Sequence, residues 1–219
     1  RPEFGNPKVF DGNIDQSFWE SFTVTCNKDN KFLDMMEKFS GNTAGTGALV
    51  TLKDSSWLMS VVIAYQPHFL NQPEDVTVFW GYGLFPDRKG DYIKKKMTEC
   101  TGKEILTELL CHLKFHDYVS EMKKTSNCIP CILPFITSQF MPRKISDRPR
   151  VRPEGYKNLA FIGQFVEIPE GVVFTVEYSV RTAMTAVYDF LSIDKEIPAY
   201  FKGDKDIKVL FDSFVTMHK

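Results

Sequence analysis

The chain has 219 residues, of which 43% are hydrophobic and 14% aromatic. This composition can bury one large hydrophobic core or two small ones, and it excludes an intrinsically disordered chain. Lys and Arg number 27 against 28 for Asp and Glu, so the near-neutral balance argues against nucleic acid as a partner. No apolar run approaches the roughly twenty residues that a membrane-spanning helix needs.

The chain starts at Arg1, with neither an initiator Met nor a leader peptide, and we expect it to be a fragment of a longer protein. Its cysteines are odd in number and lie among apolar neighbours, in a chain too long to depend on disulfides. Reduced thiols and a cytoplasmic location are the simpler interpretation. The five are Cys26, Cys100, Cys111, Cys128 and Cys131.

Strand patterns dominate the first third of the chain. Residues 21–26 place Phe22, Val24 and Cys26 on one face, and runs rich in β-branched and aromatic residues follow at 47–52, 57–64 and 76–84. The short polar stretch 53–56 predicts a hairpin between the second and third runs. These patterns indicate a mixed, largely antiparallel sheet.

Two helices accompany these strands. Residues 31–39 carry Phe32, Met35, Met36 and Phe39 at helical spacing. A second helix is predicted over 103–113, with Thr101 as N-cap and a buried stripe. That stripe comprises Ile105, Leu106, Leu109, Leu110 and Leu113. We assign residues 1–140 to one lobe made of a sheet and its covering helices.

Cys128-Ile129-Pro130-Cys131 has the spacing of a redox dithiol, in which a helix begins at the first Cys. Here Pro134 and β-branched residues follow at once, so the pattern favours an extended segment. No nearby His or second Cys pair completes a zinc site, and we predict structural thiols and no metal.

Residues 141–153 contain five basic residues and three prolines, which predicts a linker or extended loop over 141–157. Its default role is a solvated loop. Arg143 and its neighbours could instead hold a phosphate or carboxylate, because the guanidinium fork matches those groups. Upstream, His68 follows an apolar strand in the sequence Gln66-Pro67-His68-Phe69, where a surface His and a carboxylate-binding His are both open.

Residues 158–191 predict a strand, a turn and a helix. Leu159 to Ile162 is typical of a strand covered on both faces, and Gly163 ends it where a ligand could approach closely. A helix from about 176 to 191, capped by Thr175, would point its N-terminus back at this strand end. The expected buried positions are Val176, Val180, Ala183, Met184, Val187 and Leu191. The arrangement fits a cradle for a ring carbonyl or phosphate, and equally a plain strand-to-helix connection.

The tail, residues 192–219, contains apolar residues from Val209 to Val215 among several lysines. This pattern predicts a small basic amphipathic helix that contacts an anionic membrane or packs against a partner subunit of a homodimer.

Several long strings identify a resemblance over essentially the whole chain: FGNP at 4–7, WESFTVT at 19–25, YQPHF at 65–69, FWGYGLFPD at 79–87, KKKMTECTGKEI at 94–105, ITSQFMPR at 136–143, and NLAFIGQF followed by VVFTVEYSVRTAM. Together they resemble the C-terminal part of the FAD-dependent oleate hydratases, also called myosin-cross-reactive antigens. Such strings are far more specific than a short glycine motif.

The resemblance implies the fold class α+β / α/β: a substrate lobe with a largely antiparallel sheet, plus the last strand and helix of a Rossmann-like FAD lobe. It also implies addition of water to a cis double bond of a long unsaturated fatty acid. The family's catalytic residues have no counterpart here, so we assign no catalytic residue to this chain. The residues expected to face FAD are Gly163, Gln164, Phe165, Val173, Phe174 and Thr175.

The same resemblance places the fatty-acid carboxylate near Val62, Ala64 and His68. Many family members carry Thr and Asn at the first two positions, and here only the His is kept. Two lost hydrogen-bond donors would cost on the order of 1 to 3 kcal/mol each, so Arg143 is an alternative anchor.

Three functions remain open. The first is an FAD-dependent fatty-acid hydratase. The second is a flavin-dependent double-bond isomerase that uses the same channel. The third is a non-catalytic lipid-binding or assembly module.

Overall fold

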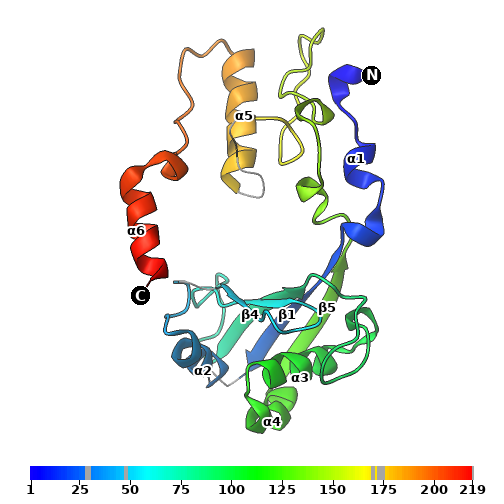
Figure 1. Cartoon of the computed structure of the whole chain (residues 1–219), viewed down its shortest axis with the longest axis vertical. Coiled ribbons are helices and arrows are strands. Elements are labelled where there is room, and N and C mark those ends of the chain that lie inside the picture. The colour runs from blue at the N-terminus through cyan, green and yellow to red at the C-terminus, as the bar shows by residue number, and fades with distance from the viewer. Residues whose placement is uncertain (28–30, 47–48, 169–170, 172–175, 219) are drawn as a thin grey trace. The chain divides into compact units, whose positions relative to one another are not determined.

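The computed structural model describes residues 1–27, 31–46, 49–168, 171 and 176–218 (Figure 1). The chain divides into two compact units. The sheet unit comprises Asn13–Ser138, and the α5 unit comprises Arg1–Gly12 together with Gln139–Lys219. The first twelve residues, which the sequence assigned to the sheet lobe, therefore belong with the C-terminal part, where the Phe4 ring meets the edge of Phe161.

The sheet unit is built on five antiparallel strands in the order β2-β3-β4-β1-β5. They are β1 (Trp19–Asn27), β2 (Leu49–Thr51), β3 (Met59–Val62), β4 (Val76–Gly83) and β5 (Ser126–Leu133). The predicted mixed, largely antiparallel sheet is confirmed, as is the hairpin between β2 and β3. The extended segment predicted around Cys128 is strand β5, which pairs with β1 at the edge of the sheet.

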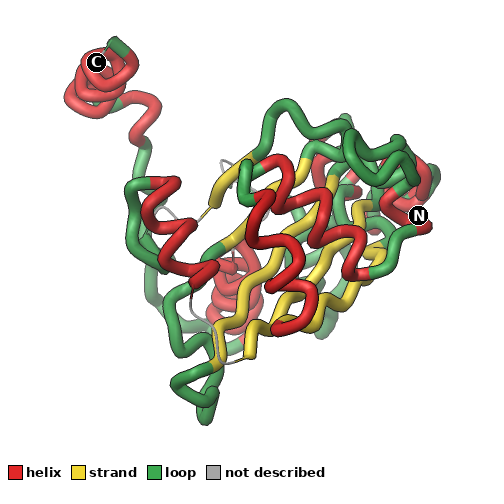
Figure 2. Tube along the Cα trace, turned by 90° about the horizontal axis from the view of Figure 1, so that it is seen from below, coloured by secondary structure: helices red, strands yellow, loops and turns green. Residues whose placement is uncertain are grey.

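The three longer helices of this unit all cover the same face of the sheet (Figure 2). They are α2 (Lys31–Ser40), α3 (Gly102–His112) and α4 (Val119–Thr125). Phe22, Val24 and Cys26 of β1 enter the core between sheet and helices, as predicted. Phe32 and Met36 anchor α2, whereas Phe39 is exposed.

Helix α3 begins at the predicted N-cap, Thr101, which forms a capping box with Glu104. The Thr101 side chain accepts a hydrogen bond from the Glu104 backbone, and the Glu104 carboxylate accepts one from the Thr101 N–H. The Lys95 ammonium and these Thr101 hydrogen bonds lower the pKa of Glu104 to about 2. All five predicted stripe residues of α3 are buried.

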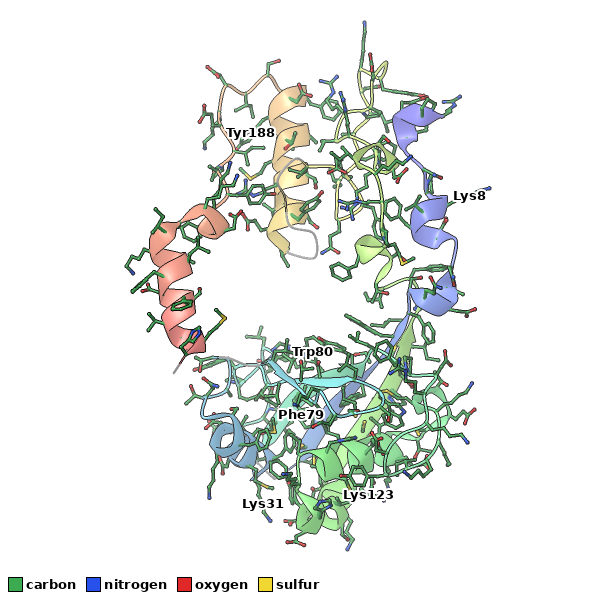
Figure 3. The ribbon with its side chains drawn as sticks, viewed as in Figure 1. Lys8, Lys31, Phe79, Trp80, Lys123 and Tyr188 are labelled. Atoms are coloured by element: carbon green, nitrogen blue, oxygen red, sulfur yellow. The ribbon has the colours of Figure 1, made fainter. Side chains whose placement is uncertain are left out.

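The second face of the sheet carries no described helix of its own unit. Side chains alternate along β4, so Phe79 lies in the core while Trp80 lies on the opposite face (Figure 3). Trp19 stacks on Tyr82 there, with ring centroids 4.5 Å apart. We call this surface the aromatic face, and its central members are Trp19, Val62, Trp80 and Tyr82.

The α5 unit contains α1 (Lys8–Asp11), α5 (Val176–Phe190) and α6 (Ile207–Met217). Its small core comprises Val151, Val166 and Ala186.

Short 3-10 turns occur in both units, at Pro2–Phe4, Ile14–Gln16, Met97–Glu99, His116–Tyr118, Ser138–Phe140, Ile145–Asp147 and Gly203–Lys205.

Residues 158–162 do not form the predicted strand. The Phe161 N–H bonds to the Val151 carbonyl, but no continuous ladder follows, and Ile162 is 63% exposed. A strand needs a neighbouring strand for its backbone groups, and none of the described residues supplies one here. The apolar run is therefore extended chain that packs on α5 through one side only.

The stretch 141–157 is not a solvated linker. Arg148 and Val151 are buried, and the Arg152 guanidinium pairs with Asp189 of α5 at 2.8 Å. Apolar positions at Val151 and Pro153 between the basic residues fix this segment against the rest of the unit. The basic residues thus serve packing within the α5 unit as well as charge.

Helix α5 has the predicted bounds to within a residue, but its buried face was predicted wrongly. Tyr178, Arg181, Thr182 and Ala186 are buried, while Val176 is 81% exposed. Val180, Val187 and Leu191 are also exposed. The loop before the helix has backbone groups that need hydrogen-bond partners, and the polar face of α5 supplies them. The apolar stripe is left without cover among the described residues.

Candidate functional site

Gly163 forms a corner against the second turn of α5. Its φ of +105° is a conformation that residues with a side chain rarely adopt, and a Cβ added there would meet no atom of the described residues within 4 Å. Its N–H donates to Thr182 Oγ1 at 2.8 Å, and that hydroxyl donates to the Ser179 carbonyl. The corner therefore presents a bare Cα face to open space, while its own donor is already used.

The residues after Gly163 are held by side chains as well. Arg148 donates to the Gln164 carbonyl at 3.0 Å. The Tyr178 hydroxyl donates to the Val166 carbonyl and accepts from the Ile168 N–H. Four side-chain hydrogen bonds thus hold the backbone between 163 and 168, whereas the Gln164 side-chain amide has no hydrogen bond to any described residue.

Phe165 lines an apolar pocket of about 300 Å³ within the α5 unit. The rings of Phe165 and Phe10 form a T-shaped pair with their centroids 5.5 Å apart. Phe4, Pro7 and Pro149 complete the apolar wall. The predicted FAD-facing residues Gly163, Gln164 and Phe165 are all at least partly exposed to solvent. Val173, Phe174 and Thr175 lie outside the described residues.

Arg143 lies 3.9 Å from the Glu167 carboxylate. It belongs to the α5 unit, and His68 belongs to the sheet unit, so the structure does not bring these two predicted carboxylate anchors together in one compact unit. A larger pocket of about 770 Å³ near Glu167 is lined by Arg148 and Arg150 but also by Glu3 and Glu154. Its mixed charges give no preference for an anion.

Val62 is the last residue of β3 and lies on the aromatic face, and Ala64 follows two residues later, beyond the end of the strand. Val62 is opposite Trp80 in the register of β3 and β4, and it is partly exposed. His68 follows in the loop between β3 and β4 and is exposed. Val62 thus lies on the apolar surface, Ala64 and His68 follow it in the chain after β3, and His68 is the only one of these three that has a polar side chain.

The sequence reading missed a cluster of Asp91, Glu108 and His112. His112 Nε2 lies 3.1 Å from Asp91 Oδ2 and 3.4 Å from Glu108 Oε1. The buried Glu108 carboxylate accepts the N–H groups of Asp91, Tyr92 and Ile93. Burial opposes ionisation of Asp91, yet hydrogen bonds from Ser56 and the charge of His112 lower its pKa overall.

Among the described residues, these three side chains are the ones whose ligand atoms lie close enough together to hold a metal ion. Their carboxylate oxygens already accept backbone and Ser56 hydrogen bonds, and so we assign the cluster to fixing the loop before α3. The only signal in the sequence is the spacing of Glu108 and His112, which puts both on one face of α3.

Two further buried groups bear on chemistry. Glu20 is buried on the core side of β1, and burial raises its pKa to about 7. Burial also raises the pKa of Cys128 to about 12, and all five cysteines are free. A thiol with such a pKa is a poor nucleophile, which agrees with a structural role for the Cys128-x-x-Cys131 segment.

Comparison with known proteins decides the family. The sequence profile of the MCRA family matches residues 1–188 of the chain. The chain belongs to the MCRA family. The match includes β1 to β5, the Gly163 corner and most of α5, and it leaves α6 outside.

Two curated relatives carry names that describe a reaction. An oleate hydratase of Streptococcus pyogenes serotype M49 (strain NZ131) is 42% identical over 97% of this chain, and a linoleate hydratase of Lactiplantibacillus plantarum is 34% identical over 94%. The MCRA chain described here spans 38% and 39% of the length of these relatives. Among its described helices, none is long and apolar enough to cross a membrane.

Proposed function

We propose that this chain is the C-terminal part of an FAD-dependent fatty-acid hydratase that adds water to a cis double bond of an oleate-like acid. The observation that carries the proposal is the 42% identity to an oleate hydratase over 97% of the chain. The geometry of both units supports it, because each offers one open, mainly apolar surface at the residues that the resemblance singles out.

The Gly163 corner fits a flat cofactor ring. The space where a Cβ would stand is open, so a ring can approach the backbone closely, and the Gln164 amide can bond its polar edge. Phe165 adds the apolar pocket beside it. FAD bound there would supply a structural and electrostatic surface without net electron transfer.

The aromatic face fits the acyl chain. Trp80, Tyr82 and Val62 offer apolar surface, and the exposed His68 at its end offers a cation or hydrogen-bond donor for the carboxylate. Val62 and Ala64 have no polar side-chain atoms, so in this proposal His68 is the anchor from this group of residues.

The acid that protonates the alkene and the base that activates water come from outside this chain in the proposal. Glu20 is the described acid with a near-neutral pKa, but it lies in the core on the other side of the sheet from the aromatic face. We therefore propose that this chain shapes the cofactor and substrate surfaces, and that the isolated chain is inactive.

The proposal includes a cytoplasmic location and a homodimer, with α6 as the contact surface. Helix α6 buries none of its residues, and Ile207, Leu210, Phe214 and Met217 form a stripe along it. A partner subunit or the surface of a membrane would cover this stripe.

The test is incubation of the full-length protein with FAD and oleate, followed by mass spectrometry. We expect a product heavier than oleate by one water. A product of unchanged mass with a shifted double bond would instead show an isomerase. Fatty-acid binding without any product would leave only a lipid-binding module.

A further inference from the structure

His68 lies in an exposed loop, yet hydrogen bonds to its backbone hold it in place. The loop joins β3 to β4, and Tyr65, Phe69 and Leu70 within it are exposed. The imidazole and the Phe69 ring form a T-shaped pair with their centroids 4.7 Å apart, and the imidazole makes no hydrogen bond to a described residue. Its ring nitrogens are therefore available to a ligand, and the loop backbone must keep the ring in place.

Gln72 holds the His68 backbone. Its Oε1 accepts the N–H of His68 at 2.9 Å and that of Phe69 at 3.2 Å. Its Nε2 donates to the Val76 carbonyl, at the first residue of β4, and to Gln66 Oε1 at 2.8 Å. The four hydrogen bonds of this amide thus link the turn that carries His68 to the first residue of β4.

Gln66 connects this turn to the buried part of β4. Its Nε2 donates to the carbonyls of Val78 and Ala64, and its Oε1 accepts the Val78 N–H at 3.2 Å. Val78 is buried, and its backbone pairs with Thr25 of β1 in the sheet register. The Gln66 amide therefore bonds both backbone groups of Val78, as a neighbouring strand would, and Gln72 is bonded to Gln66.

We propose that Gln72, supported by Gln66, is a positioning residue that fixes His68 for binding of the fatty-acid carboxylate. This inference rests on the proposed function, which places the carboxylate at His68. The loop contributes little buried apolar surface that would order it, so the amide network supplies the order. Because Val62 and Ala64 have no polar side-chain atoms, a displaced His68 has no neighbour among them that can replace it.

The experiment measures binding of oleate and of oleyl alcohol to the full-length protein through quenching of Trp fluorescence. The two probes share the acyl chain, and only oleate has the carboxylate. The variants are Gln72→Met, which keeps the length of the side chain but removes its hydrogen bonds, His68→Ala and the double variant. Gln16→Met serves as the control, because Gln16 is an exposed Gln of the same unit without side-chain hydrogen bonds to described residues.

We expect Gln72→Met to weaken oleate binding about tenfold, as loss of a well-placed charged contact does, and to leave oleyl alcohol unchanged. The double variant should bind oleate no more weakly than His68→Ala alone, because Gln72 acts through His68. Additive losses, equal losses for both probes, or oleate binding like the wild type in Gln72→Met would each overturn the inference. If His68→Ala binds oleate like the wild type, the carboxylate site itself is wrong, which is a separate failure of the proposed function.

Discussion

Thr182 Oγ1 lies 2.8 Å from the backbone nitrogen of Gly163 and accepts its hydrogen. Thr182 is fully buried, so water cannot take the place of the Gly163 N–H at its hydroxyl. The bond ties the corner that faces the proposed cofactor surface to the second turn of α5. It also means that Gly163 contributes an open Cα face to a ligand and no hydrogen-bond donor.

Thr182→Val should therefore move the corner while keeping the shape of the side chain. The half-buried Gly163 N–H would lose this partner at a cost of at most about 3 kcal/mol, and relaxation of the backbone at 163 is the way to recover it. We expect full-length Thr182→Val to bind FAD about tenfold more weakly, measured by quenching of flavin fluorescence. Thr182→Ser keeps the hydroxyl and should bind FAD within about threefold of the wild type. Equal FAD affinity in the Val variant would show that the corner does not contact the cofactor.

Gly163→Ala tests the open space directly. Its φ of +105° disfavours Ala, but no atom in the part of the chain that the structure describes lies within 4 Å of the new methyl group, so we expect a loss of stability of about 1 to 2 kcal/mol. Gly155→Ala is a matched control, because Gly155 has a φ of +85° and equally open surroundings in the same unit. Both variants should lose similar stability in denaturant, and only Gly163→Ala should lose FAD binding. A parallel loss of binding in Gly155→Ala would point to general destabilisation instead.

Strands β1 to β4 and helices α2 and α3 of the sheet unit could be predicted because their sequence patterns repeat along the chain, whereas helix α4 was not predicted. Phe22, Val24 and Cys26 alternate with polar residues, and one buried face follows. Thr101 and Glu104 form a local capping box that depends on four residues alone. Such signals need no knowledge of distant parts of the chain.

The α5 unit was harder to predict because the burial of its residues depends on which other segments they contact. Val176 and Val180 have the spacing of a buried stripe, but Tyr178 and Thr182 bond the loop that the helix meets. Residues 158–162 have strand propensity without a strand beside them among the described residues. Propensity indicates which faces can be buried, and the partner decides which faces are.

The candidate site was predictable only in part. His68 follows from the resemblance, whereas the network of Gln66 and Gln72 depends on contacts between a loop and β4 that have no period. The contacts of Asp91 with Glu108 and His112 span 17 and 21 residues and leave no pattern in the sequence either.

Glu108→Gln should destabilise the chain by about 2 to 3 kcal/mol, because an NH₂ group would replace an oxygen that accepts backbone N–H groups in a buried site. The measurement is denaturant unfolding of the 219-residue chain. Glu99→Gln, at an exposed carboxylate, should change stability by less than about 0.5 kcal/mol. The midpoint of the wild type should also be the same with and without EDTA, and a lower midpoint with EDTA would show that the cluster holds a metal.

Glu20 predicts a specific pH dependence of stability. Burial raises its pKa from 4.5 to about 7 in the folded chain, so the folded state prefers the neutral acid. Between about pH 4.5 and pH 7 the unfolded chain releases this proton before the folded chain does, and stability falls as pH rises through that window. The loss amounts to about 3 kcal/mol and is complete above the folded pKa.

Glu20→Gln removes this titration while keeping the shape of the side chain. We expect the variant and the wild type to have similar free energies of unfolding at pH 4, and the variant to be more stable at pH 8. Denaturant unfolding at the two pH values measures the difference, and taking variant minus wild type cancels the titration of all other groups. A difference that does not change with pH would mean that Glu20 has the same pKa in the folded and the unfolded chain.

The apolar stripe of α6 predicts an association that disappears when the stripe is made polar. Leu210 and Phe214 are four residues apart on one face of the helix and both exposed, whereas Lys208 and Asp212 pair with each other at 3.0 Å. In the full-length protein, Leu210→Ser with Phe214→Ser should convert a dimer to a monomer in analytical ultracentrifugation if a partner subunit covers the stripe. If a membrane covers it, the same variant should lose flotation with anionic vesicles and keep its sedimentation. Thr216→Ala, at a position with no stripe residue three or four places away, should alter neither property, and a double Ser variant that keeps both would show that neither partner covers α6.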